Sequence, residues 1–488
     1  MKTQRRLFPV YLSAFIFLVM AYKVSAQSAS AHHAETEDTV KALFVSDIHF
    51  EPFRDPEKAV KLAAAPESEW STILAARDSK DRDAQWAAIE KACPTRGEDT
   101  TYTLYESSLR AIREEAGGAK FVTVSGDLIA HSFTCKFAAV FPNAAPGDYR
   151  AFVEKTIDFV VTSLRKALPG VPVYAALGNN DSDCGDYQLD PNSAFLESTG
   201  KLMAADLPDA EKSRAERDFA AGGYFSASLP APILHTRLLV LDDLFMSRRY
   251  ASCGKKADPA PAAAQIAWME QQLNEARRSG EKVWMLAHIP PGIDAYSTAT
   301  KGASLCAGAP PTMFLSSESL PQALAKYGDV IRLAIFAHTH MDELRLLEPE
   351  QPSAEERGVA VKMVSSISPV NGNNPSFTVA RIEPRSGTLK DYRVVVASNQ
   401  TGVDATWSEE YDFAKAYHEP DFSAASVKKL IADFDADPAG QSSESQTFIQ
   451  SYSPGHGLRE LQAFWPQFLC ALKHDDGAAF ASCVCGAK

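Results

Sequence analysis

The chain has 488 residues and a formal net charge of −13, with 45% hydrophobic and 23% charged residues. The acidic balance argues against a protein that coats nucleic acid, and the ordinary globular proportions exclude wholesale disorder and collagen-like repeats. Eight cysteines are too few for a disulfide-built miniprotein but enough for several bridges in an oxidising compartment.

The N-terminus has the layout of a secretory signal peptide. Basic residues precede an apolar run over residues 7–22, and small residues follow the run up to Ala26. An uncleaved anchor is the alternative, but the run contains Pro9 and is shorter than the roughly 20 residues that a bilayer span needs. We predict a signal peptide over residues 1–26, cleaved near Ala26, and a secreted or periplasmic protein with no stable membrane span.

Short aliphatic and β-branched runs then alternate with helical patterns. Strands are predicted at residues 42–46, 120–125, 171–177, 237–242, 282–287 and 333–336. Helices that end at Gly or Pro-Gly are predicted at residues 104–116, 149–168 and 262–279. Because continuous apolar strands are usually covered on both faces, the pattern predicts an α/β fold.

After residue 360 the predicted strands no longer alternate with helices. Strands predicted at residues 361–367, 377–382 and 392–397 are separated by polar turns, which suggests an antiparallel or mixed addition to the sheet. Helices are predicted at residues 426–434 and 458–472, and three cysteines cluster near the C-terminus. We therefore divide the chain into a main domain over residues 27–399 and a small helical subdomain, pinned by a disulfide, over residues 400–488.

Polar groups suited to metal binding follow five of the predicted strands. They are Asp47 and His49, then Asp127, then Asn179 and Asn180, then His288, and finally His338 and His340. The carboxyl ends of strands are where open α/β sheets bind their ligands. Each group alone is a weak signal, but their order and shared position favour one site. Carboxylate and amide oxygens mixed with imidazoles suit zinc, manganese or iron.

The residues resemble the calcineurin-like metallophosphoesterase superfamily, whose pattern is D-x-H, GD, GNH with an acidic residue, H, and GHxH. Within it the chain is most similar to the acid sphingomyelinase-like phosphodiesterases, on account of GDLIAH at 126–131, HIPPG at 288–292, HTHMDE at 338–343 and NNPSF at 373–377. The resemblance implies a four-layer α-β-β-α sandwich, with the catalytic domain over residues 27–399.

The resemblance also implies two divalent metal ions, zinc first and manganese or iron as alternatives. One ion would be held by Asp47, His49, Asp127 and His340, and the other by Asp127, Asn179, His288 and His338. Two cations close together repel, so a shared anion such as Asp127 is needed between them. The family reaction is in-line attack on phosphorus by a metal-bridging hydroxide.

Two positions depart from the family pattern. Asn180 stands where the family has a His, and an amide can donate a hydrogen bond but cannot supply a proton. His131 matches a histidine that the sphingomyelinase-like branch assigns to leaving-group protonation, so we expect His131 to be the catalytic acid; support of a metal ligand is the alternative. Ala337 replaces a Gly, which requires only that its φ is not positive.

The expected function is a secreted metal-dependent phosphoesterase, most simply a phosphodiesterase. Only residues 27–41 lie between the expected cleavage point and the first motif, too few for a saposin-type lipid-extracting domain. A small phosphoester such as a nucleotide, a phosphorylated headgroup or a short polyphosphate is therefore expected as substrate. The alternatives are a polyphosphatase or nucleotide phosphatase of the same fold, or a metal-bound protein that binds phosphate ligands with impaired catalysis. The oligomeric state is open.

Cysteine pairing is partly open. A bridge between Cys253 and Cys306 would brace the loops near His288, and Cys470 is expected to pair with Cys483 or Cys485. The pairings that compete among the other cysteines are Cys135–Cys184, Cys93–Cys135 and Cys93–Cys184.

Overall fold

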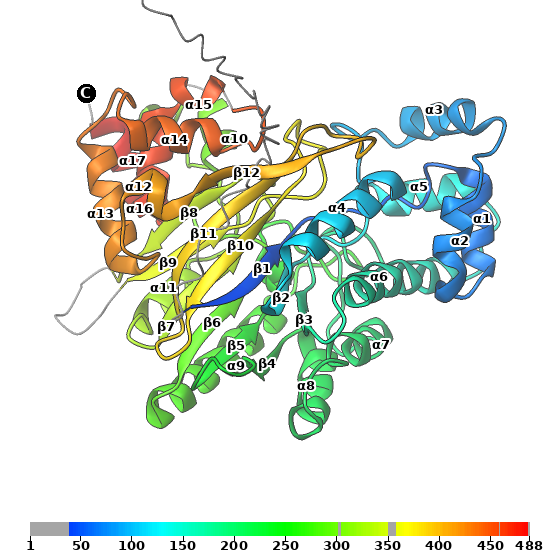
Figure 1. Ribbon diagram of the computed structural model, residues 1–488, viewed down its shortest axis with the longest axis horizontal. Helices are drawn as coiled ribbons and strands as arrows, with labels where there is room; N and C mark the ends of the chain where they lie inside the picture. The colour runs from blue at the N-terminus through cyan, green and yellow to red at the C-terminus, as the bar shows by residue number, and fades with distance from the viewer. Residues whose placement is uncertain (1–38, 301–303, 350–357, 458, 487–488) are drawn as a thin grey trace, which may run out of the picture. The chain divides into compact units, whose positions relative to one another are not determined.

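The computed structural model describes residues 39–300, 304–349, 358–457 and 459–486. The described residues belong to one compact unit, Asp38–Lys488 (Figure 1). The predicted signal peptide lies outside the described residues. Within those ranges, every helix is too short or too polar to cross a membrane.

The first of two sheets has six strands in the order β12-β11-β10-β1-β2-β3. The strands are β1 Val40–Val45, β2 Ala119–Ser125, β3 Val173–Ala176, β10 Ser376–Glu383, β11 Thr388–Ala397 and β12 Trp407–Asp412. β1, β2 and β3 run parallel, whereas β10, β11 and β12 add antiparallel strands on the other side of β1. The carboxyl ends of the three parallel strands therefore meet at one edge.

The second sheet has the order β4-β5-β6-β7-β9-β8. Its strands are β4 Phe225–Ser228, β5 Thr236–Val240, β6 Lys282–Leu286, β7 Ile331–Phe336, β8 Glu343–Leu347 and β9 Val359–Met363. β5, β6, β7 and β9 run parallel, and β4 and β8 close the two ends in antiparallel fashion.

The two sheets pack face to face. Trp284 of β6 makes edge-on ring contacts with Phe44 of β1 and Phe121 of β2, at centroid distances of 5.9 and 5.8 Å. All three rings are fully buried. The Trp284 indole nitrogen, which could not stay unpaired in such a core, donates to the Gly387 carbonyl at 2.7 Å.

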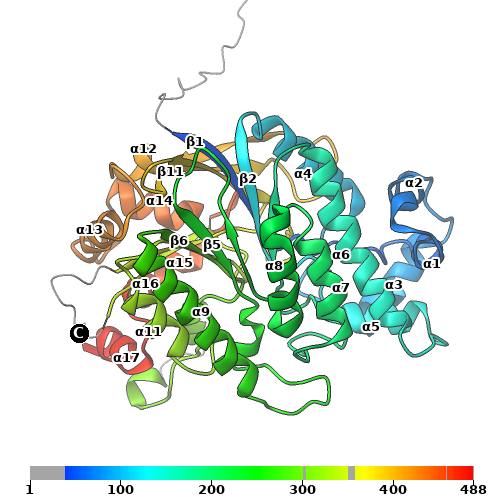
Figure 2. The ribbon, with the colours of Figure 1, turned by 90° about the horizontal axis from the view of Figure 1, so that it is seen from below.

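Helices cover the outer faces of both sheets (Figures 1 and 2). α4 Tyr102–Glu115 and α6 Asp148–Ala167 lie on the side of the first sheet, and α9 Ala260–Ser279 and α11 Ser319–Lys326 on the side of the second. The expected α-β-β-α layering is confirmed. The other helices of the main part are α1 Pro56–Ala64, α2 Trp70–Ala75, α3 Arg82–Ala92, α5 Phe133–Val140, α7 Ala194–Met203, α8 Asp209–Gly222 and α10 Ala295–Thr300.

The C-terminal residues are largely helical, as expected, but they begin with the edge strand β12. The helices are α12 Phe413–Tyr417, α13 Ala424–Asp435, α14 Ser443–Ser451, α15 Arg459–Ala463, α16 Trp465–Lys473 and α17 Gly477–Gly486. The single helix predicted over residues 458–472 is two helices, because Pro466 in the first turn of α16 cannot donate the backbone hydrogen bond that would continue α15.

All eight cysteines are paired: the expected Cys253–Cys306 bridge is wrong, and the expected pairing of Cys470 with Cys483 is confirmed. The bridges are Cys93–Cys135, Cys184–Cys253, Cys306–Cys485 and Cys470–Cys483. Cys253 does not pair with Cys306. A β-bridge between the backbones of Gln188 and Ala251 holds their loops together and places Cys253 beside Cys184. For the same reason Cys184 is not available to Cys135 or Cys93, which pair with each other across α3 and α5.

Candidate metal centre

The seven predicted ligands come together where the two sheets meet. Asp47 and His49 follow β1, Asp127 follows β2, Asn179 follows β3, His288 follows β6, and His338 and His340 follow β7. β1, β2 and β3 are neighbours in one sheet, and β6 and β7 in the other. The facing sheets therefore bring all five loops to one place.

One half of the cluster contains the side chains expected for the first metal site. The Nε2 atom of His49 lies 3.2 Å from Nε2 of His340 and 3.4 Å from Asp127 Oδ2. Asp47 Oδ1 lies 3.7 Å from His49 Nε2 and 3.5 Å from His340 Nε2. That oxygen is buried and has no hydrogen-bond partner among the described residues. The atoms that could bind a metal thus face one another across a buried space.

The other half contains the side chains expected for the second site. His288 Nε2 lies 3.2 Å from Asp127 Oδ2, 3.1 Å from Asn179 Oδ1 and 3.2 Å from His338 Nδ1. Asp127 Oδ2 therefore lies close to histidines of both halves.

The hydrogen bonds around the histidines show why a cation fits. Nδ1 of His49 faces the Ile129 carbonyl at 3.0 Å, and Nδ1 of His288 faces the Ser125 carbonyl at 2.7 Å. A carbonyl can only accept, so both Nδ1 atoms carry the proton and, in the neutral ring, both Nε2 atoms present lone pairs to carboxylate or amide oxygens. Lone pairs converging in a buried space require a cation, and imidazole with carboxylate and amide oxygen suits a divalent one.

The electrostatics of the cluster favour positive charge on two of its histidines. Burial lowers the pKa of His49, but the negative charges of Asp127 and Asp47 outweigh burial and raise that pKa to about 9. The same competition, led by Asp127, raises the pKa of His288 to about 10. For Asp47, burial raises the pKa, but His340 and His49 outweigh burial and bring it to about 2. His49 and His288 therefore attract protons, whereas burial, with His288 and His49 as neighbours, lowers the pKa values of His338 and His340 to about 3.

The backbone around these side chains is unusual. Asp47, His49, Asp127, His338 and His340 all have positive φ, between 44° and 70°. Residues other than glycine adopt a positive φ only at a cost in conformational energy, and residues with such backbone strain cluster at functional sites. Ala337, which replaces a family glycine, does not have a positive φ, so its backbone meets the condition under which a side chain is tolerated there.

Gly178 allows the loops after β2 and β3 to touch. A Cβ atom at Gly178 would lie 2.2 Å from Asp127 Oδ1 and 2.3 Å from the Asp127 backbone nitrogen, which no structure accommodates. A glycine is therefore needed for Asp127 and Asn179 to approach closely.

His131 lies beside the first half of the cluster and belongs to a buried charge network. Its ring stacks on His49 with a centroid distance of 3.9 Å, and its Nδ1 lies 2.9 Å from Asp99 Oδ1. The buried Asp99 also accepts from the His131 backbone and from Lys136, which pairs with Glu51. Since Asp99 occupies Nδ1, only Nε2 of His131 is free to act on a ligand.

Asn180 binds the Asp127 carboxylate, and Asp181 binds the backbone of the loops around it. Asn180 donates from its backbone nitrogen to Asp127 Oδ1 at 2.8 Å and from its side chain to Asp127 Oδ2 at 2.9 Å. Asp181 is fully buried and accepts from the backbone nitrogens of Leu128, Ile129 and Gly178. These bonds fix the position of the Asp127 loop.

A cavity of about 1030 Å³ opens onto the cluster. Its lining includes Asp127, His131, Asn179, Asn180, His338 and His340. The lining also includes Arg96, Arg248 and Arg249, together with the carboxylates of Asp186, Asp294 and Glu343, so positive charge is available near the cluster. The volume suits a small organic ligand.

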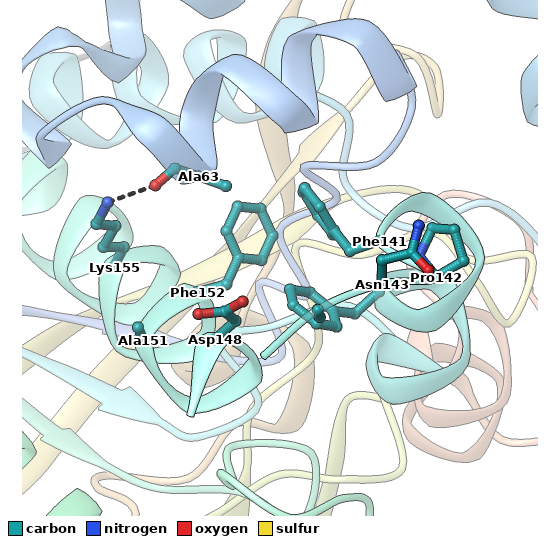
Figure 3. Close-up of a pocket in the computed structure, with 10 residues that line it drawn as sticks. Ala63, Phe141, Pro142, Asn143, Asp148, Ala151, Phe152 and Lys155 are labelled. Atoms are coloured by element: carbon teal, nitrogen blue, oxygen red, sulfur yellow. Dashed lines mark hydrogen bonds between the residues drawn. The ribbon is translucent and has the colours of Figure 1, made fainter. Parts of the chain in front are cut away.

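A second cavity of about 360 Å³ lies between α1, α5 and α6 and is chemically different (Figure 3). Phe137, Phe141 and Phe152 line it, and its charged groups are Asp148 and Lys155. The Lys155 ammonium donates to the Ala63 and Ala65 carbonyls. This second cavity therefore has none of the metal-ligating groups that line the first cavity.

Sequence reasoning missed several residues that contact the predicted site. Asp99 precedes α4 in an irregular loop and is recognisable only through its contact with His131. Asp186 and Tyr187 contact Asn179 and His338 of the second half, Arg249 contacts Asp186 and Tyr187, and no motif marks any of the three. Asp181 could have been predicted, because it stands at the position where the family pattern GNH is followed by an acidic residue.

Known proteins resemble this chain over most of its length. The calcineurin-like phosphoesterase model matches residues 40–342. The chain is 25% identical over 405 residues to the acid sphingomyelinase-like phosphodiesterase 3b of Homo sapiens, covering 79% of this chain and 80% of that protein. It is 24% identical over 402 residues to the cyclic GMP-AMP phosphodiesterase SMPDL3A of Mus musculus, covering 79% and 82%. The matched region contains all seven clustered side chains, and the chain belongs to the calcineurin-like phosphoesterase family, as a metal-dependent phosphoester hydrolase.

Proposed function

We propose that the protein is an extracytoplasmic phosphodiesterase that uses two divalent metal ions, zinc first, to hydrolyse a small phosphodiester. The observation that carries the proposal is the convergence of seven side chains from five strand ends on two adjoining spaces that share Asp127. The four disulfides support the compartment, because disulfides persist mainly outside the cytoplasm.

Each ligand has a definite place in the proposal. Asp47, His49, Asp127 and His340 hold the first ion, and Asp127, Asn179, His288 and His338 hold the second. Divalent ions at such a site lower the pKa of bound water and neutralise charge that develops on the phosphoryl oxygens. The protein's part is to fix these ligands through the Ile129 and Ser125 carbonyls.

His131 supplies the proton for the leaving group. It lines the cavity, its side chain is 33% exposed, and Asp99 holds its Nδ1, so Nε2 can donate to the departing oxygen. Asn180, which the sequence places at the family's His, supplies hydrogen bonds and no proton. Its backbone nitrogen and side-chain amide orient Asp127.

A phosphodiester substrate is favoured by the relatives, which are named as phosphodiesterases. The cavity of about 1030 Å³ has room for groups on both sides of the phosphorus, and its arginines favour a substrate with further negative charge, such as a nucleotide. A polyphosphate would satisfy the same charges and is the second candidate.

Asp127→Asn tests the proposal directly. This change removes the shared anion while keeping shape, and we expect loss of at least one metal per chain and of phosphodiester turnover. Asp148→Asn is the matched control, because Asp148 lines the separate cavity and contacts none of the clustered residues. Metal analysis and turnover of bis-aryl phosphate, nucleotide, polyphosphate and sphingomyelin would be measured together. Wild-type metal content and turnover in Asp127→Asn would refute the proposal.

A further inference from the structure

Three residues outside the proposed ligand set are linked to two ligands of the second site. Asn179 donates from Nδ2 to Asp186 Oδ1 at 2.7 Å, and Asp186 Oδ2 lies 3.4 Å from Nη2 of Arg249. The Arg249 guanidinium lies 3.9 Å from the centre of the Tyr187 ring. The Tyr187 hydroxyl lies 3.3 Å from Nε2 of His338. We call Asp186, Arg249 and Tyr187 the outer clamp.

The outer clamp joins two loops that are tied together in two further ways. Cys184 and Cys253 form a disulfide between these loops. The Tyr187 carbonyl accepts from the Ala251 nitrogen at 3.0 Å, which joins the two loops a second time. Within its own loop, the Tyr187 backbone nitrogen donates to the Asn179 carbonyl at 2.9 Å. The positions of Asp186 and Arg249 therefore depend on each other.

The contacts select which atom each ligand presents. Because Asp186 accepts from the Asn179 amide nitrogen, the amide oxygen faces His288 Nε2, at 3.1 Å. Because Tyr187 occupies Nε2 of His338, the Nδ1 atom faces His288, at 3.2 Å. Without the clamp an amide can turn over and an imidazole can present its other nitrogen.

The first site is held differently. His49 is fixed by the Ile129 carbonyl, and Asp47 accepts from the neighbouring Ser46 hydroxyl. Within the described chain, none of the recorded hydrogen bonds or ion pairs of the clamp residues reaches Asp47, His49 or His340.

We infer that the outer clamp is a positioning device for the second metal site alone: Asp186, Arg249 and Tyr187 orient Asn179 and His338 for that ion. The inference rests on the proposed ligand set. Asp186 and Arg249 are 41% and 59% exposed, so their ion pair by itself stabilises the fold little. Its effect is on ligand orientation, where the loss of such a partner typically weakens metal binding by about 10- to 100-fold.

Metal titration of the full mature chain tests the inference. Asp186→Ala removes the acceptor for Asn179, and we expect one metal of wild-type affinity and a second bound about 10- to 100-fold more weakly. Asp186→Asn keeps an oxygen acceptor and should recover much of that loss. Tyr187→Phe removes only the hydroxyl and should weaken the same ion. Cobalt titration followed by visible absorption reports ligand geometry without any turnover.

Arg248→Met and Arg249→Met form a matched pair. Both arginines line the cavity, but among the described residues only Arg249 has an ion pair and a ring contact. Weakening of the second metal by Arg249→Met and not by Arg248→Met supports the clamp. If the circular dichroism of Asp186→Ala differs from that of the wild type, the metal titrations of Tyr187→Phe and Arg249→Met are used to judge the inference instead.

The outcomes separate the two claims. A wild-type protein that binds fewer than two metals refutes the dinuclear proposal, and the inference falls with it. A wild-type protein with two metals, together with folded clamp variants that bind both ions as tightly, refutes the inference alone. Equal weakening of both ions also refutes it, because the clamp would then be a general support of the fold.

Discussion

His131→Ala should slow hydrolysis of substrates with poor leaving groups far more than hydrolysis of activated aryl esters. Nδ1 of His131 lies 2.9 Å from Asp99 Oδ1, and among the described residues no hydrogen bond engages Nε2. A positioned general acid contributes about 10²- to 10⁴-fold, which at ~1.4 kcal/mol per tenfold is about 3 to 5 kcal/mol of barrier. An activated phenolate departs without a proton, so its hydrolysis should lose much less.

The assay compares kcat/KM for a bis-nitrophenyl phosphodiester with that for an alkyl or nucleoside phosphodiester. Asp99→Asn, which keeps the shape but removes the charge that orients the imidazole, should give a smaller loss with the same leaving-group dependence. Metal content must be measured in parallel, because the His131 ring stacks on His49 and its ring nitrogens lie close to those of His49 and His340. Equal losses for both substrates with unchanged metal content would refute the role as proton donor, and loss of metal would show that His131 supports the site.

Three further predictions concern the metal centre: the protons released on metal loading, the pH dependence of unfolding, and the effect of Gly178→Ala. Because the pKa values of His49 and His288 are raised to about 9 and 10 in the metal-free protein, loading at pH 7.5 should release about two protons per chain, measurable by calorimetry in buffers of different ionisation enthalpy. The stabilisation from these imidazolium groups is complete below the ordinary pKa of 6.5 and should be lost as the pH rises through 9 to 10, so thermal unfolding of the metal-free protein should occur at lower temperature there; a flat profile would contradict the assignment. Gly178→Ala should abolish metal retention, since its Cβ would lie 2.2 Å from Asp127 Oδ1, whereas Gly117→Ala, with no atom within 4 Å of the added Cβ, should retain the metal. Metal analysis after dialysis decides, and full occupancy in Gly178→Ala would show that the Asp127 loop can move.

The amino-acid sequence by itself determined the parallel strands and the order of the ligands. Continuous apolar runs such as residues 282–287 are a local signal, and a polar group that directly follows such a run lies at the strand end wherever the strand pairs. The edge strands β4, β8 and β12 escaped prediction. β12 is partly exposed and carries Glu409 and Glu410, and β8 carries the buried ion pair of Glu343 and Arg345, so neither has the apolar pattern of a central strand.

Only the tertiary structure decided which distant groups meet. Cys253 pairs with Cys184 rather than Cys306 because the strand ends fold their loops together, and loop packing has no period that a sequence reveals. For the same reason Asp99 was found only beside His131, and Asp186 only beside Asn179. The ligands follow strands and so could be predicted, whereas the residues that orient them lie on irregular loops whose positions depend on contacts distant in the chain.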